Sequence, residues 1–310
     1  MAEIVISEFM EASAVATLAA RFEVLSDPRL VDDRPGLLQL LRGARALIVR
    51  NRTQVDEELL AAGPALRAVG RLGVGLDNID TAACAARNIQ VIPATGANAD
   101  SVAEYVLLAA GVLLRQAFAA GEEVAEGHWP RAKYSEGREL AGKLLGLVGF
   151  GSVGQRTATK ARAFGMRIAA YDPLLSADDP VWRALGTLRL GLDDLLAESD
   201  VVSLHLPLVS ETRDLFDRER LGRMKRSAIL VNTARGGIVD EAALAELLRF
   251  GRLGGAAIDV FAQEPLPARS PLAGAPNALL TPHIAGVTVE SNKRVSTMVA
   301  QKVLEALAAG

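Results

Sequence analysis

Short apolar runs alternate along the chain with segments whose apolar residues recur at helical spacing. This alternation is typical of a parallel sheet with helices on both faces. In the first third, strands are expected at 4–7, 22–25, 46–50, 66–70 and 89–92. A second series is expected at 144–149, 167–172, 201–206, 228–234, 255–260 and 278–282. Two separate series of strands predict two doubly wound α/β domains.

The helical pattern adds three expectations about how the strands are connected. A long helix is predicted from about Ser101 to Phe118, followed by a polar, glycine-containing stretch over 121–142. Thr53 with Asp56 resembles a capping box that would open the helix after the third strand. A last helix starts near Val289 and has no strand left to pair with, so it is expected to return to the first domain.

Composition and charge narrow the class of partner. The chain has 310 residues, of which 50% are apolar and 23% charged, as in an ordinary globular protein of about two domains. The net charge is −3 and the pI is about 5.8, without a basic block. Nucleic acids and anionic membranes are therefore not expected as partners, and a small molecule is.

The sequence contains few features that indicate a cellular compartment or a membrane. The apolar stretch 102–114 is shorter than the roughly 18–20 residues that span a bilayer, and it contains Glu104. The first ten residues lack the features of a signal peptide. The single cysteine, Cys84, excludes an intramolecular disulfide, fits a reducing compartment and is expected in the core.

The most informative motif, GFGSVG, opens the second series directly after an apolar strand. In a dinucleotide fingerprint, Gly149 permits a tight turn, Gly151 lets a pyrophosphate approach the backbone, and Gly154 lets helix and strand pack closely. The helix start supplies N–H groups to the phosphates. Asp172 ends the next strand, where it can accept hydrogen bonds from a ribose and repel a 2′-phosphate. NAD is therefore expected rather than NADP, and no metal site is assigned.

A nicotinamide enzyme needs a proton donor and acceptor, and the chain has only three histidines. His283 follows a strand, at the edge of a parallel sheet where ligands gather. His205 also ends a strand, where a structural or cofactor-facing role fits better. His128 lies in the polar connecting stretch and is expected in solvent. His283 is thus the candidate acid–base group, the alternative being a histidine satisfied at a strand end.

Two charged residues follow neighbouring strands. Glu264 could orient the His283 imidazole and fix its tautomer, unless it is only an exposed loop acid. Arg235 stands beside two glycines, which would let a substrate or cofactor approach the backbone. A guanidinium binds a carboxylate through two parallel hydrogen bonds, so Arg235 is a candidate substrate clamp. The alternative is an ion pair at a strand end.

Together, GFGSVG, LHLPL, NTARGGIVD, DVFAQEP and TPHIAG resemble the successive signatures of the D-2-hydroxyacid dehydrogenase family, in particular its phosphoglycerate dehydrogenase branch. GRLGVGLDNID, NADSVAE and GRELAGKLLGLVGFG extend the resemblance over nearly the whole chain. The resemblance implies that His283 is the acid–base group, Glu264 its partner and Arg235 the substrate clamp. It also implies that Asp259 holds the nicotinamide carboxamide, although a strand-end acid can equally cap the turn that follows it. Further NAD contacts are implied at Ser152, Val153, Leu206, Pro207, Thr233, Ala234 and Gly286.

The resemblance also implies a domain layout. A flavodoxin-like substrate domain, formed by 1–97 and 287–310, would receive an inserted Rossmann NAD-binding domain over 98–286, with the substrate in the cleft. The family is cytoplasmic, and a homodimer built around the helix beginning near Asn98 is expected. Because the chain stops at Gly310, the regulatory tail of many phosphoglycerate dehydrogenases, and feedback by serine through it, are not expected.

Substrate contacts are implied at Asn98 and at the backbone amides of Val74 and Gly75, whose glycine-rich turn can alternatively serve shape alone. Arg50, Arg71 and Arg131 occupy positions that hold a distal phosphate in the family, and each could instead be a surface arginine. If they act together, the substrate carries a second anion. The sequence then favours 3-phosphoglycerate or 3-sulfolactate without separating them.

Three alternatives stay open. Glyoxylate or hydroxypyruvate reduction is the nearest enzymatic one. A non-catalytic, NAD-sensing scaffold similar to a transcriptional corepressor is of another class, and the absence of basic arms argues against it. Formate dehydrogenases share the architecture but have a glutamine where Glu264 stands, which disfavours formate.

Overall fold

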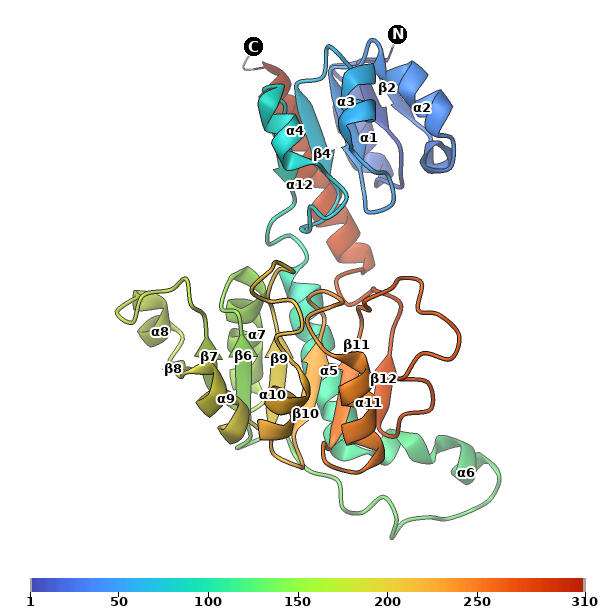
Figure 1. Cartoon of the computed structure of the whole chain (residues 1–310). Helices are drawn as coiled ribbons and strands as arrows, with labels where there is room; N and C mark the ends of the chain where they lie inside the picture. The colour runs from blue at the N-terminus through green and yellow to red at the C-terminus, as the bar shows by residue number, and fades with distance from the viewer. Residues whose placement is uncertain (1, 309–310) are drawn as a thin grey trace. The chain divides into compact units, whose positions relative to one another are not determined.

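A computed structural model describes residues 2–308, which form two compact units. Unit 1 comprises Met1–Asn98 and Val287–Gly310, and unit 2 comprises Ala99–Gly286. Each unit is built on one parallel β-sheet covered by helices, and Figure 1 shows the elements, with labels where there is room. The predicted class, two doubly wound parallel-sheet α/β domains, is confirmed.

The sheet of unit 1 has the flavodoxin-like strand order β2-β1-β3-β4-β5. Its strands are β1 (Ile4–Ile6), β2 (Val24–Ser26), β3 (Ala46–Val49), β4 (Ala68–Arg71) and β5 (Gln90–Pro93). Its helices are α1 (Ala12–Ala19), the 3-10 turn η1 (Pro28–Val31), α2 (Arg34–Leu41), α3 (Glu57–Ala62), α4 (Thr81–Ala86) and α12 (Val289–Ala308).

Alternating side chains divide the core of unit 1 between the two faces of its sheet. Ile4 and Ile6 pack on one face with the terminal helix α12, and Val5 packs on the other. Gly70 makes this packing close, because a Cβ there would lie 2.7 Å from the Val299 side chain. Cys84 is fully buried in the second face, as expected.

The sheet of unit 2 has the order β12-β11-β10-β9-β6-β7-β8, a Rossmann order extended by β12. Its strands are β6 (Leu144–Val148), β7 (Arg167–Tyr171), β8 (Leu188–Arg189), β9 (Val201–Leu204), β10 (Ile229–Asn232), β11 (Gly255–Ile258) and β12 (Ala278–Leu280). Its helices are α5 (Ala99–Arg115), η2 (Ala117–Ala120), α6 (Gly121–Ala125), α7 (Ser152–Ala163), α8 (Pro180–Ala184), α9 (Leu192–Glu198), α10 (Arg218–Arg223) and α11 (Glu241–Arg249).

The elements differ from the sequence-based expectations in three places. The edge strand β8 was missed, because its two residues are both exposed and form no apolar run. The long helix ends at Arg115 rather than near Phe118, since Gln116 has a left-handed backbone with φ of 54°. The short helix α6, which was not expected, begins the polar, glycine-containing stretch 121–142.

The capping box was also wrong. Asp56 is itself the N-cap of α3 and accepts a hydrogen bond from the Leu59 amide at 3.0 Å. The Thr53 hydroxyl instead contacts the Ser7 hydroxyl at 2.9 Å.

No single helix within residues 2–308 has the length and apolar character needed to cross a membrane. Among the described residues, only α5 taken together with Ala117–Ala125, which is bent from it by 64°, meets both criteria. Most of α5 is buried in unit 2 against the sheet and α7, as the core helix of a domain is.

Candidate active site

The turn between β6 and α7 has the geometry of a dinucleotide-binding turn. Gly149 has φ of 95°, and a Cβ there would lie 2.4 Å from the His205 carbonyl oxygen. A Cβ on Gly154 would lie 2.5 Å from the Gly149 carbonyl oxygen. A Cβ on Gly151 would meet no atom within 4 Å, so this side of the turn is open. The first and third glycines are needed for packing, and the second leaves backbone accessible to a ligand.

Groups suited to phosphate and ribose flank this turn. Helix α7 begins at Ser152, and its N-cap Gly151 provides no side-chain hydrogen bond, which leaves first-turn amides for an anion. The Asp172 carboxylate accepts hydrogen bonds from the amides of Phe150 at 2.8 Å and Leu174 at 2.9 Å. A carboxylate fixed beside the turn suits ribose hydroxyls and would repel a 2′-phosphate.

The other residues expected to contact the cofactor follow strands of the same parallel sheet, at its carboxyl edge. Leu206 and Pro207 come after β9, and Thr233 and Ala234 come after β10. The Thr233 hydroxyl oxygen is buried and has no hydrogen-bond partner in the part of the chain described. A buried polar atom left without a partner is costly, so a ligand hydrogen bond here would be favourable. These residues fit NAD.

His283 and Glu264 form a hydrogen-bonded pair in unit 2. The distance from His283 Nδ1 to Glu264 Oε2 is 2.8 Å, and Glu264 Oε1 accepts the Phe261 amide at 3.0 Å. A carboxylate only accepts, so Nδ1 carries the proton and Nε2 of the neutral imidazole has a free lone pair. The side chains are 45% and 36% exposed, so the pair is not buried in the core of unit 2.

Arg235 lies in a turn held by its own strand. The buried Asn232 side chain accepts the Ala234 amide at 3.1 Å and donates to the Arg235 carbonyl at 3.0 Å. Gly236 was expected to let a substrate or cofactor approach the backbone. This was wrong, because protein backbone occupies the space that a Cβ at Gly236 would fill. A Cβ there would lie 1.8 Å from the Phe261 carbonyl oxygen. The glycine therefore lets the segment after β10 pass against the segment that leads to Glu264.

Asp259 is buried and already has three internal hydrogen-bond donors. Its carboxylate accepts the Thr281 hydroxyl at 2.6 Å, the Ile284 amide at 2.9 Å and the Ala285 amide at 2.8 Å. The alternative that Asp259 caps the turn directly after it was wrong, because its carboxylate holds the segment after β12 instead. Sequence reasoning missed this role, as it missed Thr281 and Asn232. The available signal was a polar residue at the carboxyl end of a parallel strand, next to residues already assigned to the site.

His205 is half-buried after β9, with Nε2 3.1 Å from the Ser203 hydroxyl. Burial lowers the pKa of His205 from 6.5 to about 4. Below pH 6.5 the unfolded chain binds a proton at this position that the folded chain does not, so stability falls as the pH falls from 6.5 towards 4. This fits a structural residue that stays neutral at neutral pH.

Between about pH 7 and about pH 5, the free energy of unfolding should fall by about 2 kcal/mol less in His205→Asn than in the wild-type protein. Urea denaturation at both pH values measures the change. His128→Asn is the matched control, since the His128 side chain is 66% exposed. Equal pH dependence in wild type and His205→Asn would contradict this account of His205.

In unit 1, several expected substrate residues meet at the carboxyl edge of its sheet. Val49 is paired with Arg71 across β3 and β4, so Arg50 follows at the same edge. Arg50 donates to Asn292 Oδ1 at 2.9 Å, and burial lowers its pKa. The amides of Val74 and Gly75 donate to no protein acceptor within residues 2–308, as an anion-binding turn requires.

A buried acid that the sequence did not reveal supports this edge. Glu8 accepts hydrogen bonds from the amides of Arg50 at 2.8 Å and Thr53 at 3.0 Å and so holds the loop between them.

The other expected substrate residues have different surroundings. Arg71 turns back onto its own loop, with Nη1 3.1 Å from the Leu72 carbonyl. The Asn98 amide oxygen is buried and has no hydrogen-bond partner among the described residues. Arg131 belongs to unit 2 and is exposed in the segment after α6.

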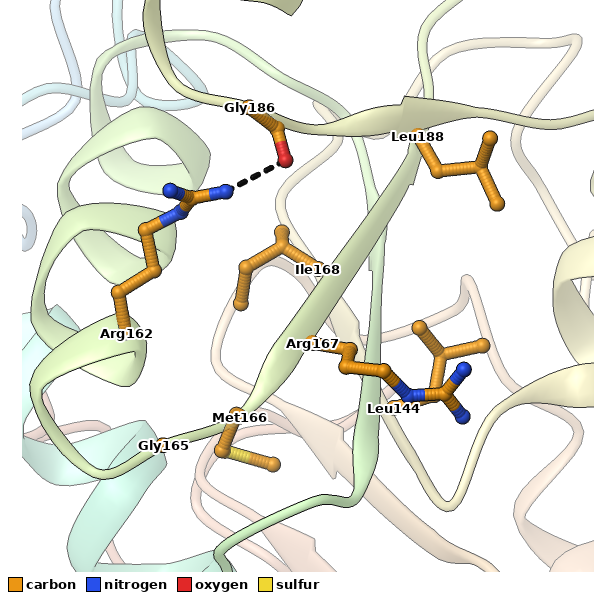
Figure 2. A pocket seen from close by; sticks show the side chains of 8 residues that line it. All are labelled: Leu144, Arg162, Gly165, Met166, Arg167, Ile168, Gly186 and Leu188. Atoms are coloured by element: carbon orange, nitrogen blue, oxygen red, sulfur yellow. Dashed lines mark hydrogen bonds between the residues drawn. The ribbon is translucent and has the colours of Figure 1, made fainter.

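A separate pocket of about 450 Å³ lies at the amino-terminal edge of the unit 2 sheet, where β6 and β7 begin. Figure 2 shows it lined by Arg162 and Arg167 among apolar side chains, with Arg162 hydrogen-bonded to the Gly186 carbonyl at 2.5 Å. None of the expected site residues lines it. The candidate active site is therefore at the opposite edge.

Comparisons with known proteins agree with this geometry. A family model described as the NAD binding domain of D-isomer specific 2-hydroxyacid dehydrogenase matches residues 107–285. The chain is 52% identical over 307 residues to an (S)-sulfolactate dehydrogenase of Chromohalobacter salexigens, covering 99% of both chains. It is 44% identical over 308 residues to a D-3-phosphoglycerate dehydrogenase of Mycobacterium tuberculosis, covering 98% of this chain and 57% of that protein.

Among solved structures, a D-lactate dehydrogenase of Aquifex aeolicus, complexed with NAD and lactic acid, matches with a TM-score of 0.83 at 28% identity. The match covers 99% of this chain and 95% of the other. From its two sheets, its dinucleotide turn and these matches, the chain belongs to the D-isomer-specific 2-hydroxyacid dehydrogenase family of NAD-dependent oxidoreductases.

Proposed function

We propose that this protein oxidises a small, doubly anionic 2-hydroxy acid at C2 with NAD, and that 3-sulfolactate is its substrate. The hydrogen-bonded pair of His283 and Glu264 is the observation that supports the chemistry most directly. Identity of 52% over nearly the full length to an (S)-sulfolactate dehydrogenase supports the substrate. The S label is consistent with D-type geometry, because sulfur changes the priority order at the carbon.

In this proposal, Arg235 binds the substrate carboxylate through two parallel hydrogen bonds. Nε2 of His283 accepts the hydroxyl proton while C2 loses its hydrogen as a hydride, and the alcohol becomes a 2-oxo acid. NAD supplies the hydride acceptor when bound. Glu264 holds the ring with Nε2 unprotonated and stabilises the imidazolium that forms. Reduction of a carbonyl runs the same steps in reverse and needs imidazolium as the proton donor.

We propose that unit 1 binds anionic groups of the substrate through Arg50, Arg71 and the turn containing Val74 and Gly75. Two free amides and two nearby arginines at one sheet edge support this. The amide oxygen of Asn98, buried without a partner, is a further candidate contact. A substrate with two negative groups fits these residues better than lactate does.

We also propose a cytoplasmic homodimer. Trp129 and Phe118 are 82% and 72% exposed along the segment that follows α5, and covering large apolar side chains favours association. A second copy is the proposed partner, and Arg131 from this segment would then serve the partner's substrate. Sedimentation velocity that finds a single chain would exclude the dimer.

The proposed function is tested with purified protein and NAD or NADP against both sulfolactate enantiomers, 3-phosphoglycerate, D-glycerate and D-lactate. We expect the highest kcat/KM for (S)-sulfolactate with NAD, and at least about 10-fold lower values for D-lactate, which lacks the second anion. Equal kcat/KM for D-lactate would contradict the second-anion assignment. NAD binding without turnover of any 2-hydroxy acid would favour the scaffold alternative.

A further inference from the structure

The segment that carries His283 has an unusual backbone. His283 has φ of 56°, in the left-handed region that residues other than glycine uncommonly occupy. Its amide donates to the Asp259 carbonyl at 2.8 Å, and the next two amides donate to the Asp259 carboxylate. A strained residue persists only where its surroundings hold it in place, so the partners of Asp259 determine how firmly the segment is held.

One hydrogen-bonded chain reaches Asp259 from helix α5. The Tyr105 hydroxyl lies 2.6 Å from Thr281 Oγ1, which lies 2.6 Å from Asp259 Oδ1. The carboxylate can only accept, so the single hydroxyl proton of Thr281 goes to it, and Tyr105 must donate to Thr281. Burial raises the pKa of Tyr105, which keeps its hydroxyl protonated for this role. Hydrogen bonds aligned in this way strengthen one another.

We propose that Tyr105 and Thr281 are positioning residues that hold His283 in place through Asp259. This inference rests on the proposed acid–base role of His283. The three residues come from α5, from the end of β12 and from the end of β11, so the chain of hydrogen bonds ties the segment to the core of unit 2. Neither hydroxyl is required to touch the substrate. Their effect is on how often Nε2 is correctly placed.

Tyr105→Phe removes only the first hydroxyl, and Thr281→Val removes the second while keeping the shape. We expect kcat to fall about 3–10-fold in Tyr105→Phe and about 10–100-fold in Thr281→Val, with KM within about twofold. Thr281→Ser restores the hydroxyl and should recover kcat to within about threefold of wild type. Tyr134→Phe and Thr159→Val are matched controls, because each removes a hydrogen-bonded hydroxyl elsewhere in unit 2.

Two measurements without substrate test the positioning separately from the reaction. Hydrogen exchange of the Ile284 and Ala285 amides should be about 10-fold faster in Thr281→Val. With only three histidines, the His283 imidazole signal can be followed by NMR, and it should broaden in the same variant.

Unchanged exchange, imidazole signal and kcat in both Tyr105→Phe and Thr281→Val would overturn the inference. A failure of Thr281→Ser to restore kcat and exchange would do the same. If the wild-type protein oxidised no 2-hydroxy acid, the proposed function would fail, while exchange and NMR would still decide whether these hydroxyls hold the His283 segment.

Discussion

Replacing His283 by asparagine is expected to lower kcat for 2-hydroxy acid oxidation by about 10²–10⁴-fold, the range that a general base contributes. The variant loses the group that accepts the hydroxyl proton. Asparagine is the appropriate replacement because it tolerates the left-handed backbone at this position, where φ is 56°. Steady-state kinetics with NAD and the best substrate measures the loss.

Three controls make this result specific to acid–base chemistry. The Kd for NAD should stay within about twofold in His283→Asn, since the fingerprint turn is unchanged. Glu264→Gln should lower kcat by a smaller factor, because an amide can still contact Nδ1 but does not stabilise imidazolium. His128→Asn should leave kcat unchanged. A wild-type rate in His283→Asn would remove this residue from the reaction.

Arg235→Gln is expected to lower kcat/KM by about 10²-fold or more. Two charge-assisted hydrogen bonds to a carboxylate contribute about 3 kcal/mol together at the lower end of their range. Arg235→Lys keeps the charge but not the planar pair of donors, so its kcat/KM should still be about 10-fold below that of the wild-type enzyme. Initial rates over a range of substrate concentrations give kcat/KM for each variant.

Arg218→Lys is the matched control, because Arg218 is an exposed arginine of unit 2 paired with Glu246. It should retain wild-type kcat/KM. The clamp assignment would be wrong if Arg235→Gln and Arg218→Lys had the same kcat/KM, or if Arg235→Gln changed NAD binding rather than substrate dependence.

Most of the site features that the sequence could predict are residues at the carboxyl ends of strands. In a parallel sheet the carboxyl ends of all strands meet at one edge, so residues after successive apolar runs are expected together even when they are distant in sequence. This reasoning predicted that Glu264 and His283 could meet, and the structure has them hydrogen-bonded at 2.8 Å. The glycine spacing likewise predicted the turn between β6 and α7.

What the sequence could not predict depends on tertiary contact. Nothing in the helical pattern around Tyr105 indicates that its hydroxyl contacts Thr281, which is 176 residues away in the chain. The close backbone approach at Gly236 and the burial of Glu8 beneath the 50–53 loop are also consequences of packing between segments. The two-residue strand β8 is too short and too exposed to leave a pattern.

A single-turnover experiment tests most directly whether this chain transfers a hydride from C2 of a 2-hydroxy acid to NAD with His283 as the base. Sulfolactate deuterated at C2 is mixed with enzyme and NAD, and the reduced nicotinamide is analysed by mass spectrometry. We predict that deuterium appears in the reduced cofactor with wild-type enzyme and is transferred about 10²–10⁴-fold more slowly by His283→Asn. Bound NAD that gains no deuterium from any C2-deuterated 2-hydroxy acid would contradict the account.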